Sequence, residues 1–221
     1  ALGTVLGITF NTGAGNDSAS TVLATLVADG TDDTVLSMGA GTDTLTITDT
    51  APTLTDTHFT NVSGAEKLTL TGAGSQSLTV GGSFKSGFSD GVTITSAGGG
   101  DDDSFVYSGG LYDYATTIAL TTASAGDATT GSEDITITTG DGADSVTLTA
   151  ASLVGGSGAD GAAISISTDA GDDTIVVTTS TIVAQTISEL LTIDAGTGAD
   201  TITLTTTTST TALSAANIVI A

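Results

Sequence analysis

The chain has 221 residues, of which 25 are Asp or Glu and only 2 are Lys or Arg, so its formal net charge is −23. It has no arginine, and its two cationic side chains are Lys67 and Lys85. No basic patch is therefore available for nucleic-acid phosphates, and an anionic membrane leaflet would repel the surface. No apolar run approaches the roughly 18 residues of a membrane span. We therefore expect neither nucleic-acid binding nor membrane insertion.

The composition favours an all-β fold over an acidic disordered tail. Hydrophobic residues make up 38% of the chain, and Val, Ile and Leu alternate with Thr in many segments. β-branched residues suit a pleated strand, whereas disordered acidic segments are poor in them. Cysteine is absent, which excludes disulfides and thiolate metal sites. A bound metal is the obvious substitute for disulfides in stabilising a secreted fold.

Seven related segments recur along the chain. Each has the form apolar-x-apolar, a few polar residues, G-x-G-x-D or a shortened version of it, and x-apolar-x-apolar, which predicts strand, turn and strand. In chain order they span residues 8–20, 36–47, 68–80, 92–107, 135–148, 164–177 and 191–204. Internal repeats with a period of about 20–50 residues are typical of solenoids. We therefore predict one elongated domain over residues 1–221, a parallel β-helix or β-roll solenoid.

An antiparallel β-sandwich is the alternative fold. Asp-Gly is a strong β-hairpin signal, because both residues accept the positive φ of a tight turn. Such pairs occur at Asp29-Gly30, Asp90-Gly91, Asp141-Gly142 and Asp160-Gly161.

The turns have the composition of calcium sites. Glycine reaches positive φ without steric cost and lets carbonyl oxygens point into a turn, and aspartate adds a short carboxylate. Calcium takes 6 to 8 such hard oxygen ligands. We therefore predict turns that bind Ca²⁺, with the candidate ligands Asp17, Asp33, Asp43, Asp101, Asp102, Asp103, Asp141, Asp144, Asp160, Asp169, Asp172, Asp173, Asp194 and Asp200.

The motif G-x-G-x-D followed by x-apolar-x resembles the RTX nonapeptide of calcium-filled β-rolls. Most of the chain, including "FTNVSGAEKLTLTGAGSQSLTV", is also similar to the β-roll region of bacterial S-layer proteins that type I systems secrete. The resemblance implies a calcium-binding, secreted, cell-surface protein. Its ligand roles transfer best to the intact motifs, at Asp17, Asp43, Asp144, Asp173 and Asp200.

The function expected from these features is structural. We predict an extracellular, calcium-stabilised subunit or module of an S-layer, surface filament or large adhesin. Identical chains would associate end to end, because "ALGTVLGITF" and "SAANIVIA" are apolar and uncharged. We expect no enzyme, because the acids lie in repeated turns and neither H-E-x-x-H nor G-x-S-x-G occurs.

An adhesin module that binds ice or a glycan, including a cell-surface polysaccharide, is the alternative function. The segments "LTITDT" at 45–50 and "TITLTTTTSTT" at 201–211 place hydroxyls at alternate strand positions, as in some ice-binding adhesins. The aromatic segment "SFVYSGGLYDY" at 104–114 could stack against sugars, although we expect it to plug a thin core.

Overall fold

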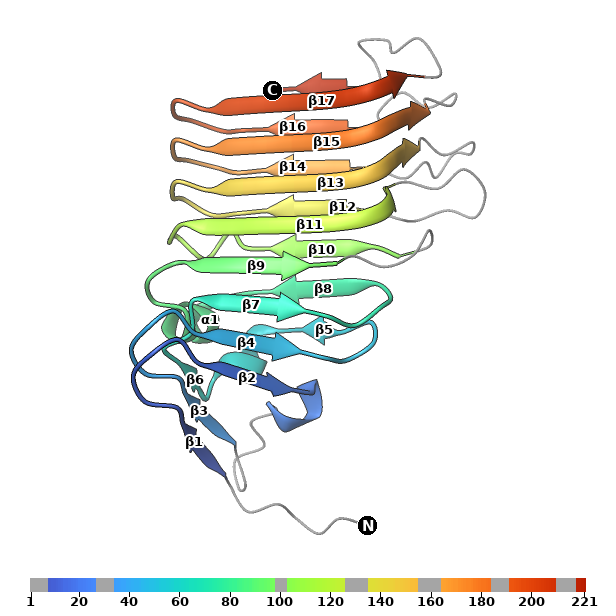
Figure 1. The fold of residues 1–221 in the computed structure, drawn as a ribbon. Helices are drawn as coiled ribbons and strands as arrows, with labels where there is room; N and C mark the ends of the chain where they lie inside the picture. The colour runs from blue at the N-terminus through green and yellow to red at the C-terminus, as the bar shows by residue number, and fades with distance from the viewer. Residues whose placement is uncertain are drawn as a thin grey trace.

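The computed structural model describes residues 8–26, 34–97, 103–125, 135–154, 164–183, 191–209 and 218–221. Within these ranges the chain is almost entirely β, and every strand pair is parallel. The strands stack coil upon coil along one axis, as Figure 1 shows. The predicted parallel β-solenoid is confirmed, and the antiparallel sandwich suggested by the Asp-Gly pairs is wrong.

An eight-stranded sheet runs the length of the solenoid. Its strands, in order from the N-terminal end, are β2 (Ser18–Thr21), β4 (Thr44–Ile47), β7 (Lys67–Leu70), β9 (Val92–Ser96), β11 (Thr116–Ala125), β13 (Ser145–Val154), β15 (Thr174–Val183) and β17 (Thr201–Ser209). The last four strands have nine or ten residues, against four or five in the first four. The sheet is therefore widest in the C-terminal half.

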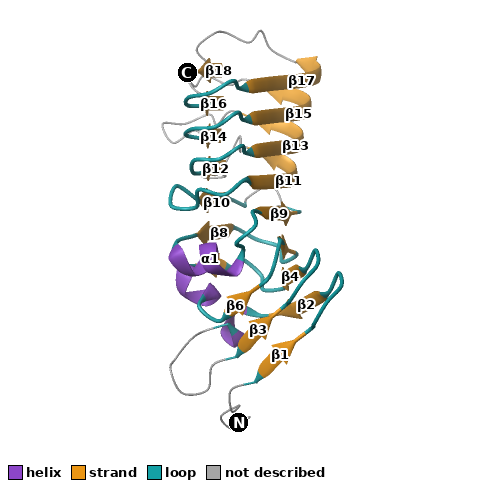
Figure 2. Ribbon diagram, turned by 90° about the vertical axis from the view of Figure 1, so that its left-hand side faces the viewer, coloured by secondary structure: helices purple, strands orange, loops and turns teal. Residues whose placement is uncertain are grey.

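A seven-stranded parallel sheet lies across the core from the eight-stranded one (Figure 2). Its strands are β5 (Thr53–Leu54), β8 (Gln76–Thr79), β10 (Phe105–Ser108), β12 (Ile135–Thr138), β14 (Ile164–Ser167), β16 (Leu191–Asp194) and β18 (Ile218–Ile220). Short strands that alternate between two sheets explain why the sequence repeats its apolar-x-apolar pattern on both sides of each turn.

The N-terminal half has a third side. A three-stranded sheet joins β1 (Thr9–Asn11), β3 (Val35–Ser37) and β6 (Val62–Ser63), and three short helices accompany it: η1 (Leu23–Thr25), η2 (Asp56–Phe59) and α1 (Gly82–Gly87). Helix α1 packs beside β6. None of the helices in the described part of the chain is long and apolar enough to cross a membrane.

Alternating side chains fill the core between the sheets. In β15, for example, Ile175 and Val177 are fully buried while Thr174 is exposed. An aromatic cluster closes the space next to α1: the rings of Phe84 and Phe88 stack at 4.4 Å, and Tyr112 lies 5.3 Å from Phe84. The expected plugging role of the aromatic segment is therefore confirmed for Tyr112, which is completely buried.

Candidate functional site

The most regular feature of the molecule is a column of five-residue turns along one edge of the solenoid. These turns lead from the three- or seven-stranded sheet into the eight-stranded sheet, and they stack at the left edge of Figure 1. Their residues are 13–17, 39–43, 140–144, 169–173 and 196–200. The third position is always glycine, with φ between 124° and 157°.

Stacking requires glycine at this third position where one turn lies directly on another, as at Gly41, Gly171 and Gly198. A Cβ on Gly171 would lie only 1.8 Å from the carbonyl oxygen of Gly142 in the preceding coil, and one on Gly198 would lie 1.7 Å from that of Gly171. The first position also has positive φ in most turns, and Asp169 adopts it at 53°. Asp tolerates this conformation better than most side chains. The G-x-G pattern therefore reflects the close approach of successive coils.

Backbone hydrogen bonds join successive turns within each of the two groups, 13–17 with 39–43 and 140–144 with 169–173 and 196–200. Gly171 N–H donates to the carbonyl of Thr197 at 2.9 Å, and Thr197 N–H donates to that of Asp169 at 2.8 Å. The same bond joins Gly142 to the carbonyl of Ala170, at 2.8 Å. The carbonyl groups of the first two turn positions thus already accept hydrogen bonds from neighbouring coils.

The fifth position forms two stacks of carboxylates. The strand registers align Asp17, Asp43 and Glu66 in successive coils, which we call the N-terminal stack. They also align Asp144, Asp173 and Asp200, the C-terminal stack. Val92 and Thr116 occupy the same column between the two stacks. Adjacent layers are about 4.8 Å apart in a parallel sheet, so like charges are brought close together.

Within each stack, one carboxylate oxygen accepts the backbone N–H of the preceding coil. Asp173 Oδ1 accepts from Asp144 at 2.8 Å, and Asp200 Oδ1 accepts from Asp173 at 3.0 Å. Asp43 Oδ1 accepts from Asp17 at 2.7 Å, and Glu66 Oε2 accepts from Asp43 at 2.7 Å. Apart from Asp17, each stacked carboxylate therefore caps the beginning of the strand in the preceding coil.

The second oxygen of most stacked aspartates is buried and has no hydrogen-bond partner. This holds for Oδ2 of Asp17, Asp43, Asp144 and Asp173. The last three residues are 0–2% exposed. A buried charged oxygen without a partner costs free energy, unless a proton or a cation neutralises it. These oxygens are the strongest sign of a ligand in the described structure.

Burial raises the pKa of Asp144 to about 6. The neighbouring Thr139 hydroxyl and the N–H of Thr116 favour the charged form, although no hydrogen bond of good geometry joins the Thr139 hydroxyl to Asp144. The negative charges of Asp173 and Asp169 add to the upward shift. The ionised form of this carboxylate is therefore destabilised by its surroundings at neutral pH.

The other predicted ligands do not join the stacks. Asp141, Asp169, Asp172 and Asp194 are exposed. Two of them accept backbone N–H groups: Asp172 Oδ1 accepts Ala199 N–H of the next coil at 2.9 Å, and Asp194 Oδ1 accepts Gly196 N–H in its own turn at 3.1 Å. Asp103 lies in the connection from β9 to β10, on the opposite edge of the eight-stranded sheet. Asp33, Asp101, Asp102 and Asp160 lie outside the described residues.

The third repeat does not belong to this column. Its turn at 72–76 leads from β7 to β8, so Gln76 lies on the other edge. Gln76 is buried, donates to the carbonyl of Gly72 at 2.7 Å and accepts from the Ser96 hydroxyl at 2.6 Å. The acid of this coil is instead Glu66, in a segment that the motif does not match. Glu66 lies directly before strand β7, as Asp43 lies directly before β4. This position is the sequence signal that could have identified Glu66 as a member of the column.

The stacks supply some, but not all, of the oxygen ligands that a calcium ion needs. Two successive buried Oδ2 atoms, such as those of Asp144 and Asp173, could ligate one ion between layers. Calcium takes 6 to 8 oxygens, so water and backbone carbonyls would have to supply the rest. Among the described residues, no three His, Cys, Asp or Glu side chains form a group that could hold a metal ion.

The fold and these turns define a parallel β-solenoid with two stacks of buried and partly buried carboxylates. No protein-family model, curated protein or solved structure matches the chain.

Proposed function

We propose that this chain is an extracellular, calcium-stabilised structural module of a cell-surface assembly such as an S-layer, a filament or a large adhesin, without catalytic activity. The observation that carries the proposal is the buried, unpartnered oxygen in successive stacked aspartates. In a chain with a net charge of −23, no lysine or arginine in the stacks neutralises them. The resemblance to RTX and S-layer β-rolls supports the same ion and location.

Calcium would act on the stacks through their spare oxygens. Each ion would relieve repulsion between two coils without breaking the N–H bonds to the other oxygens. Extracellular calcium modules bind at roughly 10⁻⁴–10⁻³ M, and calcium at 100 times the dissociation constant stabilises a fold by about 2.7 kcal/mol per site. Such a module would be least stable where calcium is scarce and would fold after export.

Thermal unfolding with calcium and with chelator tests this proposal. Calcium should raise the melting temperature of the wild type. Asp173→Asn keeps an oxygen that can accept Asp144 N–H but removes the charge, so the calcium-dependent rise should shrink. The matched control is Asp194→Asn, an exposed site outside the stacks, which should keep the full rise. A wild type whose melting temperature is the same in chelator and calcium would refute the proposal.

The two ends of the described solenoid support end-to-end association with a second copy. Among the described residues, none donates an N–H to Asp17 at its ladder position, and none accepts Asp200 N–H. A second copy stacked on β17 would supply both partners through the same bond that joins Asp173 to Asp200. It would also extend the eight-stranded sheet from β17 to the partner's β2.

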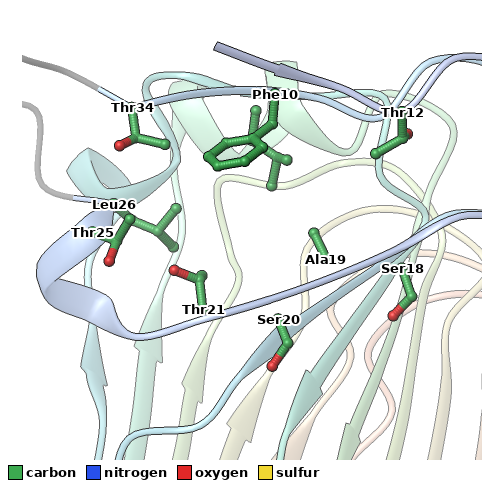
Figure 3. A pocket seen from close by; sticks show the side chains of 10 residues that line it. Phe10, Thr12, Ser18, Ala19, Ser20, Thr21, Thr25, Leu26 and Thr34 are labelled. Carbon is green, nitrogen blue, oxygen red and sulfur yellow. The ribbon is translucent and has the colours of Figure 1, made fainter. Parts of the chain in front are cut away.

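The N-terminal end also offers an apolar surface. A cavity of about 330 Å³ opens between β1 and β2, and Phe10, Ala19, Leu26 and Leu36 line it (Figure 3). Phe10 is 50% exposed, and Ile220 at the other end is 57% exposed. Light scattering of the 221-residue chain in millimolar calcium should detect oligomers. Phe10→Lys should abolish them, whereas Leu111→Lys, at an exposed site in the middle of the solenoid, should not. A monomeric wild type at high concentration would rule out this association.

A further inference from the structure

The outer face of the eight-stranded sheet carries an ordered array of hydroxyl groups. Along each long strand, three alternate residues point away from the buried core positions such as Ile118, Leu148 and Val177. On β11, β13, β15 and β17 these outward residues form three rows across the strands: Thr117, Ser145, Thr174 and Thr201; Ala119, Thr147, Val176 and Thr203; and Thr121, Thr149, Thr178 and Thr205. Ten of the twelve are Ser or Thr.

The register of this array does not depend on coil length. Thr121, Thr149, Thr178 and Thr205 are paired directly across the strands, although they are 28, 29 and 27 residues apart in the sequence. The four strands lie side by side with closely similar directions in Figure 1. The coils therefore differ in length in the connections between the strands. Within a row, neighbouring hydroxyls stay as far apart as neighbouring strands.

The array has no charge, although the chain has 25 acidic residues. The same face continues over the shorter strands with Ser18, Thr44, Thr93 and Thr46, and its single charged residue there is Lys67. None of these outward positions is aromatic. A face without carboxylates does not suit cations, and one without aromatic rings lacks the usual stacking platform for a sugar.

The spacing of neighbouring residues within a row is close to the distance between second-neighbour oxygens in ice. Parallel strands repeat at about 4.7–4.9 Å. In a tetrahedral network with hydrogen bonds of about 2.75 Å, second-neighbour oxygens are about 4.5 Å apart. The strand spacing exceeds this oxygen spacing by about 0.3 Å per strand. Across four strands the accumulated mismatch is still less than one hydrogen-bond length. A threonine also presents a methyl group beside each hydroxyl, so the array can order water around the methyl groups as well as bond to it.

We propose that the three rows on β11, β13, β15 and β17 form a binding face for ice. The ligand is the ordered oxygen lattice of a water crystal, and the hydroxyls anchor the first water layer at the strand spacing. This inference is independent of the calcium proposal, because the face lies outside the carboxylate stacks. It adds a ligand to what is otherwise a structural module.

Partition into growing ice tests the proposal. The folded chain should be enriched in the ice fraction, whereas ordinary solutes are excluded from it, and it should shape ice crystals. Thr149→Tyr and Thr178→Tyr each place a ring on one of the two central strands of the array and should lower the enrichment at least tenfold. Ser165→Tyr, an outward and partly exposed position on β14 of the opposite sheet, should leave it within twofold. Circular dichroism would establish that each variant is folded.

Two results would overturn the proposal. One is a wild-type chain that is excluded from ice. The other is enrichment that all three variants retain or lose equally, since it would not depend on this face. A parallel pull-down with crystalline cellulose separates ice from a polysaccharide surface, and binding to cellulose without binding to ice would also overturn the proposal.

Discussion

Asp173 Oδ1 accepts the backbone N–H of Asp144 at 2.8 Å, while Oδ2 of the same carboxylate is buried without a partner. One side chain thus has two opposite effects on stability. Its first oxygen satisfies a strand end in the coil before it. Its second oxygen places an uncompensated charge about one layer from the carboxylates of Asp144 and Asp200.

The two effects can be separated by mutation. In calcium-free buffer, Asp173→Ala should lower the free energy of unfolding by about 1–3 kcal/mol, because it leaves the buried N–H of Asp144 unsatisfied. Asp173→Asn keeps an acceptor and removes the charge, so it should match or exceed the wild type. Urea unfolding at pH 7 measures both. If the alanine and asparagine variants were equally unstable, the hydrogen-bond role would be wrong.

The pH dependence of the metal-free chain should report the raised pKa of Asp144. The pKa of this carboxyl is about 6 in the folded state, against 3.8 as its ordinary value. The folded state therefore holds the proton more tightly, so the contribution of Asp144 is complete below about pH 4 and is lost as pH rises through 6. Stability measured from pH 7 to pH 5 should rise more in the wild type than in Asp144→Asn.

Calcium reverses this expectation. Ligand carboxylates must be ionised, so saturating calcium should make the wild type less stable as pH falls. A wild-type profile between pH 5 and 7 that is the same with and without calcium, and parallel to that of Asp144→Asn, would contradict the assignment of both proton and ion to this carboxylate.

The repeat predicted the solenoid because strand-turn-strand patterns are local and recur at each coil. The sequence predicted less completely which residues would form the stacks. Asp17, Asp43, Asp144, Asp173 and Asp200 were predicted from G-x-G-x-D and do share one column. Gln76 has the same motif but turns the chain at the opposite edge, and Glu66 joins the column without it. A residue joins the column only if its turn leads into the eight-stranded sheet. The sequence motif does not show this, because it depends on how the coils stack.

The helical third side of the N-terminal half was also missed. Helix α1 has the sequence GSFKSG, with glycines at both ends, and no helical periodicity predicts it. It forms because Phe84 packs against Phe59 and Tyr112 and because Asp56 caps its first N–H groups. These are tertiary contacts between residues 25 to 28 positions apart in the sequence.

Substitution at the third turn position should be among the most damaging in the chain. Gly171→Ala combines a φ of 157° with a Cβ only 1.8 Å from a backbone oxygen. Strain and overpacking together should cost about 3 kcal/mol. Gly110→Ala is the control, because nothing lies within 4 Å of the added Cβ and its φ is not in the strained range. Chemical denaturation of both variants measures the difference, and similar stabilities would show that the coils can separate at little cost.

Asp56 should stabilise helix α1 from the neighbouring coil. Its Oδ1 accepts Phe84 N–H at 2.9 Å and its Oδ2 accepts Ser83 N–H at 3.1 Å. Burial raises its pKa, but these donors outweigh burial and leave the pKa below its ordinary value. Asp56→Ala should therefore cost about 1 kcal/mol of stability at pH 7, with or without calcium, as for other lost helix caps.

Part of this contribution should disappear in acid. Since the folded pKa of Asp56 is lowered, its stabilisation is present above the ordinary value of 3.8 and fades as pH falls below it, when the carboxyl becomes protonated. The difference in stability between the wild type and Asp56→Ala should therefore narrow in guanidinium unfolding as pH falls below 3.8. Asp90→Ala, an exposed site close to the C-terminal end of α1, should match the wild type throughout. A gap between wild type and Asp56→Ala that is independent of pH would mean that packing, and not the charged cap, sets the role of Asp56.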